Sequence, residues 1–198
     1  MTPTRVLAIP GSFRRNSYNR RLLLAAVESA PAGMSISVAE DLASLPIFSE
    51  DLEQSTPGGP EPVHRLREQV ELTDGLIIST PEYNQSLPGG LKNVIDWLSR
   101  PGPREVLIGK PVAIMGASSG RWGTRLAQAA LRQTLTAAEA VVLPQPALFI
   151  REAERLFEDT GRLTHEPTRE QLRKLVSAFA RWIDRVAPER AAASRGEP

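Results

Sequence analysis

Short apolar runs alternate with longer segments of helical periodicity along this chain. Apolar runs bounded by turn-forming residues are typical of strands buried inside a sheet. On this basis we predict five strands, at residues 5–10, 35–42, 75–80, 111–117 and 140–143. Apolar positions that recur at i, i+3 and i+4 predict helices between and after these strands. The helices cover residues 17–30, 64–72, 91–98, 124–138 and 168–186.

This alternation predicts an α/β fold. Strands separated by single helices form βαβ units and a parallel sheet. Five strands fit the flavodoxin-like order 2-1-3-4-5, a three-layer sandwich in which ligands bind outside the carboxyl ends of the strands. We expect one domain over residues 1–186, with a long loop at 43–62 and a small, polar, disordered tail at 187–198.

Composition narrows the chemistry. The 198 residues have a net charge of +1, which argues against a nucleic-acid-binding surface. The chain has no cysteine, which excludes disulfides, thiolate metal sites and cysteine nucleophiles, and with only two histidines we expect no metal site. The N-terminus enters a strand without a signal-peptide pattern, and no apolar run approaches the roughly 18 residues of a membrane span. We therefore expect a soluble cytoplasmic protein with no membrane partner.

The loop after the first predicted strand, the first loop (residues 11–19), reads GSFRRNSYN. A phosphate at this helix start would meet free backbone N–H groups and the positive end of the helix dipole. Ser12, Ser17 and Asn19 add neutral donors, and Arg14 adds a charged one. This set suits a terminal monophosphate, and the absence of GxGxxG disfavours a dinucleotide pyrophosphate. The alternative is a capped helix start, with Ser17 or Asn16 as the N-cap.

The loop after the fourth predicted strand, the third loop (residues 116–123), matches G-x-S-x-G at Gly116, Ser118 and Gly120. This pattern is the nucleophile elbow of serine hydrolases, and Asp159 and His165 follow in a suitable order. Only six residues separate these two side chains, which is unusually close for a triad. A turn or a ligand-binding loop is therefore the favoured reading, and a hydrolase stays an alternative.

The second loop (residues 81–90) reads PEYNQSLPGG, which is more irregular than a plain connection requires. We expect Ser86 to cap the following helix, with Pro88 in its first turn. Two glycines in succession, Gly89 and Gly90, cost about 1 kcal/mol each in a helix interior, so we expect either backbone or a partner subunit to approach closely there.

Together the three loops resemble the NADPH-dependent FMN reductase family, which comprises flavodoxin-like quinone, chromate and azo-dye reductases. The first loop is similar to the G-S-x-R-x-x-S-x-N phosphate signature of that family. The stretch from Pro81 to Trp97 matches P-E-Y-N-x-S-x-P-G-x-L-K-N-x-I-D-W, and the third loop resembles A-S-x-G-x-x-G from Ala117. The resemblance covers about residues 4–186. An arginine one place early, at Arg125, and Ala129 in place of an aromatic residue depart from the pattern and put the subunit contacts in doubt.

The resemblance implies FMN as cofactor, NADPH or NADH as hydride donor, and transfer of two electrons through flavin N5 to quinones, azo compounds, chromate or free flavin. It implies a homodimer or homotetramer and no catalytic side chain. The cofactor-binding residues it implies are Ser12, Arg14, Ser17, Tyr18, Asn19, Pro81, Glu82, Tyr83, Asn84, Ser118, Ser119 and Gly120. In this reading, backbone groups of residues 82–84 bind the polar edge of the flavin ring. A non-catalytic flavin carrier is a further alternative, although such carriers are typically strongly acidic.

Overall fold

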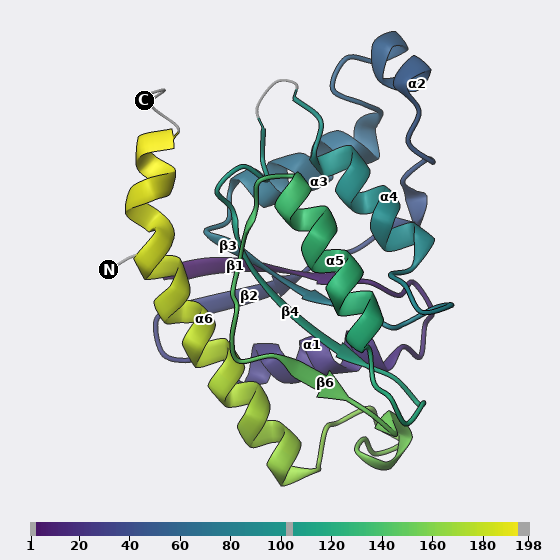
Figure 1. The fold of residues 1–198 in the computed structure, drawn as a ribbon, viewed down its shortest axis with the longest axis vertical. Coiled ribbons are helices and arrows are strands. Elements are labelled where there is room, and N and C mark those ends of the chain that lie inside the picture. Colours follow the sequence, from purple (N-terminus) through teal and green to yellow (C-terminus); the bar gives the residue numbers. More distant parts are fainter. Residues whose placement is uncertain (1–2, 102–104, 194–198) are drawn as a thin grey trace.

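The computed structural model describes residues 3–101 and 105–193, with side chains described up to residue 186. A parallel sheet runs through the centre of the molecule in the order β2-β1-β3-β4-β5, as predicted (Figure 1). A further strand, β6, pairs with the end of β4 beyond β5 and was not predicted. The strands are β1 (Thr4–Pro10), β2 (Met34–Val38), β3 (Gly75–Ser79), β4 (Pro111–Ala117), β5 (Val141–Val142) and β6 (Leu148–Ile150).

Helices cover both faces of this sheet and give the three layers expected of a flavodoxin-like fold. Alternate residues of β1 separate the two cores: Val6 and Ala8 pack with α1 and α6, and Leu7 and Ile9 pack with α3 and α4. This alternation follows from the two-residue period of a strand. The helices are α1 (Tyr18–Glu28), α2 (Glu50–Ser55), α3 (Glu61–Glu71), α4 (Gly89–Leu98), α5 (Arg125–Ala137) and α6 (Glu166–Ala193).

The segment after β2 differs from the prediction. β2 ends at Val38, and the short 3₁₀ helix η1 (Leu42–Ser44) replaces the expected continuation of the strand. The predicted loop contains α2, whose first turn is rich in acidic residues that favour a helix N-terminus. α3 begins at Glu61 because a proline is tolerated in the first turn of a helix.

This segment packs against α4 through a ring contact and three hydrogen bonds. The Pro46 carbonyl accepts hydrogen bonds from Asn93 Nδ2 at 2.9 Å and Trp97 Nε1 at 2.8 Å. The Phe48 N–H donates to Asn93 Oδ1 at 2.7 Å, and the Phe48 ring meets Trp97 edge-on with 5.0 Å between centroids. Trp97 is fully buried and is therefore a core residue.

Two buried cations hold helix ends and take no part in the loops described below. Arg67 donates from Nη1 to the carbonyls of Trp97 and Arg100, at 3.0 Å each, and burial lowers its pKa. Lys110 donates from Nζ to the carbonyls of Val70 and Thr73 at 2.7 Å each, at the end of α3. Both residues therefore have structural roles.

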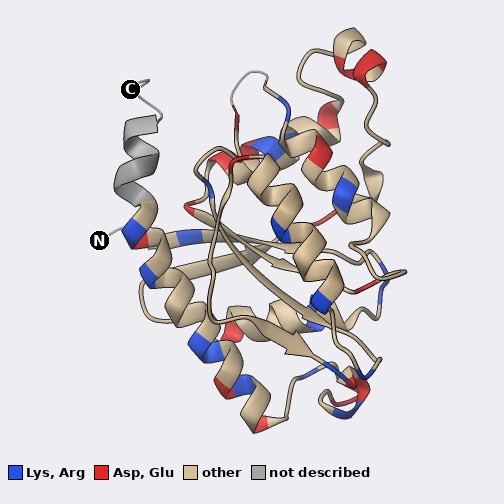
Figure 2. Cartoon of the chain, viewed as in Figure 1, with Lys and Arg blue, Asp and Glu red and all other residues tan. Residues whose placement is uncertain are grey.

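α6 continues seven residues past the predicted end and reaches Ala193, so a disordered tail from residue 187 is wrong for 187–193. Four of the seven residues at 187–193 are alanine, the strongest helix former. Residues 194–198 of the predicted tail lie outside the described residues. Basic and acidic residues interleave along the first half of α6 (Figure 2), where Glu166 pairs with Arg169 at 3.0 Å.

Candidate functional site

Three loops meet at the carboxyl edge of the sheet because they leave three neighbouring strands, β1, β3 and β4. The Gly11 N–H donates to the Ser79 carbonyl at 2.8 Å, and the Thr80 N–H donates to the Met115 carbonyl at 3.0 Å. A Cβ on Gly11 would lie 3.0 Å from the Ser79 carbonyl oxygen. The first loop therefore lies directly on the end of β3, at the switch point where this fold binds ligands.

Asn19 links the first loop to both neighbouring strands. Its side chain is buried, and Oδ1 accepts hydrogen bonds from Ser79 Oγ and the Ala117 N–H at 2.9 Å each. Its Nδ2 donates to the Ala117 carbonyl at 2.9 Å. Asn19 thus positions the loops through protein partners, and a direct contact between Asn19 and a cofactor stays a prediction.

The first loop presents backbone donors. The N–H groups of residues 12–16 make no hydrogen bond within the described part of the chain. Ser17 is the N-cap of α1, as predicted, and its Oγ accepts from the Asn19 N–H at 3.2 Å. Arg14 is exposed and makes one long contact, 3.4 Å from Nη2 to the Asn16 carbonyl. Ser12 is buried beside these donors. Consecutive free N–H groups next to an arginine fit a phosphate group.

Tyr18 lies on the other side of this loop. Its ring packs 5.7 Å from that of Phe157, in the apolar layer between α1 and α6, and Arg21 lies over it at 5.6 Å. These contacts assign the ring to packing, and a contact between Tyr18 and the cofactor remains a prediction.

The second loop forms a tight turn at its tip. Tyr83 and Ser86 exchange two backbone hydrogen bonds of 3.0 Å, and Asn84 and Gln85 have φ values of 49° and 63°. Two successive positive φ values identify a type I′ turn. The prediction that Ser86 caps α4 is therefore wrong, because Pro88 is the N-cap and supplies no side-chain bond.

This turn leaves part of the second loop available to a ligand. In the described residues, the N–H groups of Glu82 and Asn84 have no hydrogen-bond partner, whereas that of Tyr83 is used in the turn. The Tyr83 ring is exposed, and Pro81 is buried where the chain leaves β3.

The close approach expected at the start of α4 comes from the first loop. A Cβ on Gly90 would lie 2.6 Å from Cε2 of Phe13. A Cβ at Gly89 would meet no described atom within 4 Å apart from its chain neighbours and the backbone of its own helix, so the structure does not explain that glycine.

The Glu82 carboxylate has a role that the sequence did not reveal. Oε2 accepts hydrogen bonds from the Leu126 N–H at 2.8 Å and the Ala127 N–H at 3.0 Å. The side chain of Thr124, the N-cap of α5, accepts no hydrogen bond from the backbone of that helix, so Glu82 satisfies the first turn from another loop. A Cβ on Gly116 would overlap the Thr124 hydroxyl and the Thr80 carbonyl, which shows how closely the second and third loops pack.

The third loop is held from outside by the segment that follows β6. Ser118 exchanges backbone hydrogen bonds with Ile150 and Ala153, and its Oγ accepts from the Gly120 N–H at 3.0 Å. Ser119 and Gly120 are exposed. His165 Nδ1 pairs with Thr168 Oγ1 at 2.8 Å, and no hydrogen bond in the described residues joins Ser118, Asp159 and His165. The nucleophile–base pair that a hydrolase requires is absent from this part of the chain.

The geometry described above agrees with the comparisons with known proteins. The family model of the NADPH-dependent FMN reductases matches residues 4–155. The chain belongs to this family. It is 43% identical over 182 residues to an NAD(P)H-dependent FMN reductase of Pseudomonas aeruginosa, covering 92% of this chain and 96% of the relative.

Two further relatives point in the same direction. A 2-hydroxy-1,4-benzoquinone reductase of a Burkholderia species is 37% identical over 179 residues, which cover 90% of this chain and 96% of the relative. The structure of a flavoenzyme NAD(P)H:(acceptor) oxidoreductase from Paracoccus denitrificans superposes with a TM-score of 0.82 at 34% identity, covering 92% of this chain and 98% of that one. The family and these relatives are oxidoreductases, and the family model and the Pseudomonas relative are named for FMN and a nicotinamide donor, which confirms the predicted enzyme class and cofactors.

Two findings concern other kinds of partner. Within the described ranges, no helix is long and apolar enough to cross a membrane. In the same residues, no group of three or more histidine, aspartate or glutamate side chains could hold a metal ion.

Proposed function

We propose that this FMN reductase transfers two electrons from NAD(P)H to a small quinone, with FMN bound by the three loops. The observation that carries the proposal is the run of unpaired N–H groups at residues 12–16, next to the exposed Arg14, where two further loops converge. Such a run binds one terminal phosphate, and the loop has no pyrophosphate fingerprint. FMN therefore fits better than FAD.

The second and third loops are the proposed binding surface for the flavin ring. The Glu82 and Asn84 N–H groups are available for its polar edge, and the exposed Tyr83 ring offers an apolar surface beside it. The Ser119 N–H is also unpaired within the described residues and can donate where negative charge develops. The Gly120 N–H already donates to Ser118 Oγ. We therefore propose the Ser119 N–H, and not that of Gly120, as the donor to the reduced flavin.

The protein contributes binding and orientation, and the bound flavin supplies hydride transfer at N5. The loops require no side-chain acid or base for this chemistry, which agrees with a site whose edge offers backbone N–H groups. A quinone accepts two electrons in one step, and the Burkholderia relative that is 37% identical is named for a benzoquinone. We therefore propose quinones as the main acceptors, with azo compounds, chromate and free flavin as further ones.

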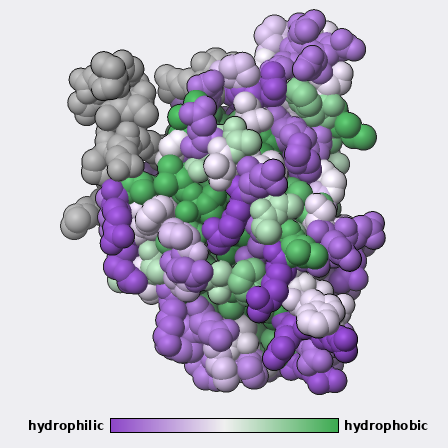
Figure 3. Space-filling view, in the orientation of Figure 1, coloured by the Kyte–Doolittle hydropathy of each residue, from purple (hydrophilic) through white to green (hydrophobic). Residues whose placement is uncertain are grey.

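We also propose a homodimer or homotetramer located in the cytoplasm. Ile47 and Leu126 are 86% and 49% exposed, and large exposed apolar side chains favour subunit contacts. Apolar surface also lies between α5 and α6 (Figure 3), where β5 forms part of the sheet edge and Val141 and Val142 are partly exposed. Light scattering on the purified protein measures its oligomeric state. A monomer at micromolar concentration would contradict the proposed dimer or tetramer.

Steady-state kinetics test the proposed activity. NADPH oxidation is followed with benzoquinone present and absent, using FMN-free protein as the control and then the same protein reconstituted with FMN. We expect quinone-dependent oxidation only after reconstitution. Oxidation that ignores the quinone, or that needs no FMN, would contradict the proposal.

A further inference from the structure

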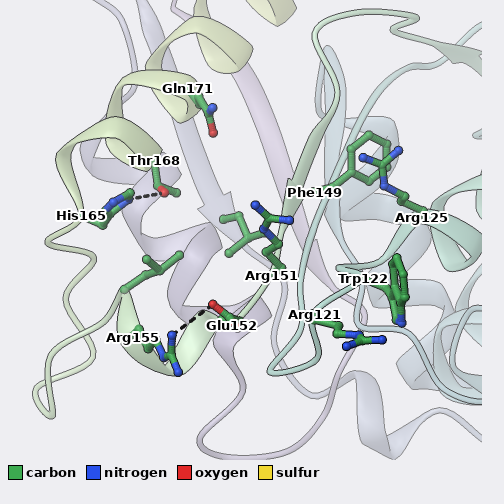
Figure 4. Close-up of a pocket in the computed structure, with 12 residues that line it drawn as sticks. Arg121, Trp122, Arg125, Phe149, Arg151, Glu152, Arg155, His165, Thr168 and Gln171 are labelled. Carbon is green, nitrogen blue, oxygen red and sulfur yellow. Dashed lines mark hydrogen bonds and ion pairs between the residues drawn. The ribbon is translucent and has the colours of Figure 1, made fainter.

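A cavity lies behind the third loop, on the side facing α6. It encloses about 820 Å³, within the usual range of small-molecule sites. The third loop, the segment after β6 and the start of α6 form its walls (Figure 4). The three sequence patterns that predict the flavin site specify none of the residues that line the cavity. Its arginines are spaced four residues apart in two segments, Arg121 with Arg125 and Arg151 with Arg155.

The cavity is strongly basic. Four arginines line it, Arg121, Arg125, Arg151 and Arg155, against the single carboxylate of Glu152. Glu152 pairs with Arg155 at 3.4 Å. The other three arginines form no ion pair within the described residues. Unpaired arginines gathered around one cavity attract a ligand with several negative charges.

Two of these arginines lie over aromatic rings of the same wall. The Arg121 guanidinium lies 5.0 Å from the Trp122 ring centroid, and the Arg125 guanidinium lies 5.2 Å from that of Phe149. Stacking restrains each guanidinium, and the planar fork of N–H groups that an arginine carries matches phosphate oxygens. Trp122 is 71% exposed, so its ring also offers a flat surface for a heterocyclic base.

The cavity and the proposed flavin site share a wall. The Glu152 N–H donates to the Gly120 carbonyl at 3.2 Å, and the Ala153 N–H donates to the Ser118 carbonyl at 3.0 Å. Residues 118–120 belong to the third loop of the proposed flavin site, and they are bonded to the segment that lines the cavity. The next residue, Arg121, lines the cavity itself. A ligand with its ring at the flavin could extend past this loop to the arginines.

We propose that this cavity binds the phosphorylated adenosine half of NADPH. The inference rests on the proposed function, since a nicotinamide donor at the flavin must place its diphosphate and adenosine elsewhere. The arginines match the diphosphate and the 2′-phosphate, and the exposed Trp122 ring matches the adenine. The 2′-phosphate is the one group that NADH lacks, so the site favours NADPH over NADH.

Direct binding tests the site without turnover. 2′,5′-ADP is titrated into FMN-loaded protein by calorimetry, with 5′-AMP in parallel. We expect Arg151→Gln to weaken 2′,5′-ADP binding about tenfold or more, the usual effect of losing a charged hydrogen bond. Arg181→Gln removes the same charge from an exposed position of α6 outside the cavity and should change binding by less than about twofold. 5′-AMP should bind more weakly than 2′,5′-ADP.

Absence of 2′,5′-ADP binding, equal affinity for 5′-AMP, or an equal effect of Arg181→Gln and Arg151→Gln would overturn the proposal. Kinetics separate it from the proposed activity, because Arg151→Gln should raise KM for NADPH more than KM for NADH. If Arg151→Gln reduces quinone with an unchanged KM for NADPH, the proposed binding of NADPH in the cavity is contradicted, and the proposed quinone reductase activity is not. Binding of 2′,5′-ADP that Arg151→Gln weakens, without any quinone reduction, would support the cavity and contradict the activity.

Discussion

The side-chain amide of Asn19 pairs with both backbone polar groups of Ala117, and each of the two hydrogen bonds is 2.9 Å long. The two residues are 98 positions apart, so this pair fixes the start of α1 against the end of β4. Ser79 Oγ donates to the same amide oxygen and adds the end of β3. One buried side chain therefore sets the relative position of the three loops.

Asn19→Ala should lower the free energy of unfolding by about 2–4 kcal/mol, because it leaves buried partners on Ala117 and Ser79 unsatisfied. It should also weaken FMN binding, since the loops lose their common tether. Urea unfolding of the FMN-free protein and fluorescence titration with FMN measure the two effects. Asn93→Ala is the matched control, because it removes two comparable hydrogen bonds on α4 and should leave FMN affinity unchanged. Equal FMN affinities in both variants would show that Asn19 only stabilises the fold.

Arg14→Ala should weaken FMN binding roughly 10- to 150-fold, which corresponds to the loss of a charged hydrogen bond worth about 1.5–3 kcal/mol. Stability should not change, because Arg14 is exposed and makes a single 3.4 Å contact. The neighbouring Arg15 is also exposed, and Arg15→Ala tests whether any positive charge in the loop would suffice. A dissociation constant that responds equally to the two substitutions would refute a specific role for Arg14.

Glu82→Ala should destabilise the FMN-free protein by about 1–2 kcal/mol, because the first turn of α5 loses its acceptor. Glu82→Gln keeps an oxygen at that position and loses the charge, so the expected cost is about 0.3–1 kcal/mol. Chemical unfolding of both variants measures this difference. An unchanged midpoint in Glu82→Ala would mean that the contact with α5 contributes nothing to stability.

Ser118→Ala should keep quinone reductase turnover within about tenfold of the wild type. The substitution removes the acceptor of the Gly120 N–H, a neutral hydrogen bond worth about 0.5–1.5 kcal/mol, and preserves every backbone group of the loop. A catalytic serine would cost several powers of ten. An ester assay runs alongside, and wild-type esterase activity that disappears in the mutant, with no quinone reduction in either protein, would restore the hydrolase alternative.

Periodicity predicted the main strands and helices because those elements carry continuous apolar faces, and the count of five alternating strands favoured the observed sheet order. It missed α2, whose residues are largely exposed, and β6, which has only three residues. It extended β2 to Leu42, although the chain turns at Asp41 with φ of 56°. Such short elements are defined by tertiary contacts, which local patterns do not contain.

The loop patterns predicted three loops that do meet at one edge of the sheet, but not the partners of their side chains. Glu82 was expected to act through its backbone, whereas its carboxylate caps α5, whose N–H partners lie 44 and 45 residues later. Asn19 fits a phosphate signature, yet its amide binds Ala117 and Ser79. Ser86 was expected to cap α4, but its backbone pairs with that of Tyr83 in a tight turn. Such pairings depend on which strands become neighbours, and this information is long-range.

The central claim is that a flavin bound at the three loops is reduced by the nicotinamide and reoxidised by a quinone. The most direct measurement is the visible absorbance of the FMN-reconstituted protein under anaerobic conditions, first with equimolar NADPH and then with equimolar benzoquinone. The account predicts that the flavin band bleaches on the first addition and returns on the second. A band that NADPH leaves unchanged, or that benzoquinone does not restore, would contradict it.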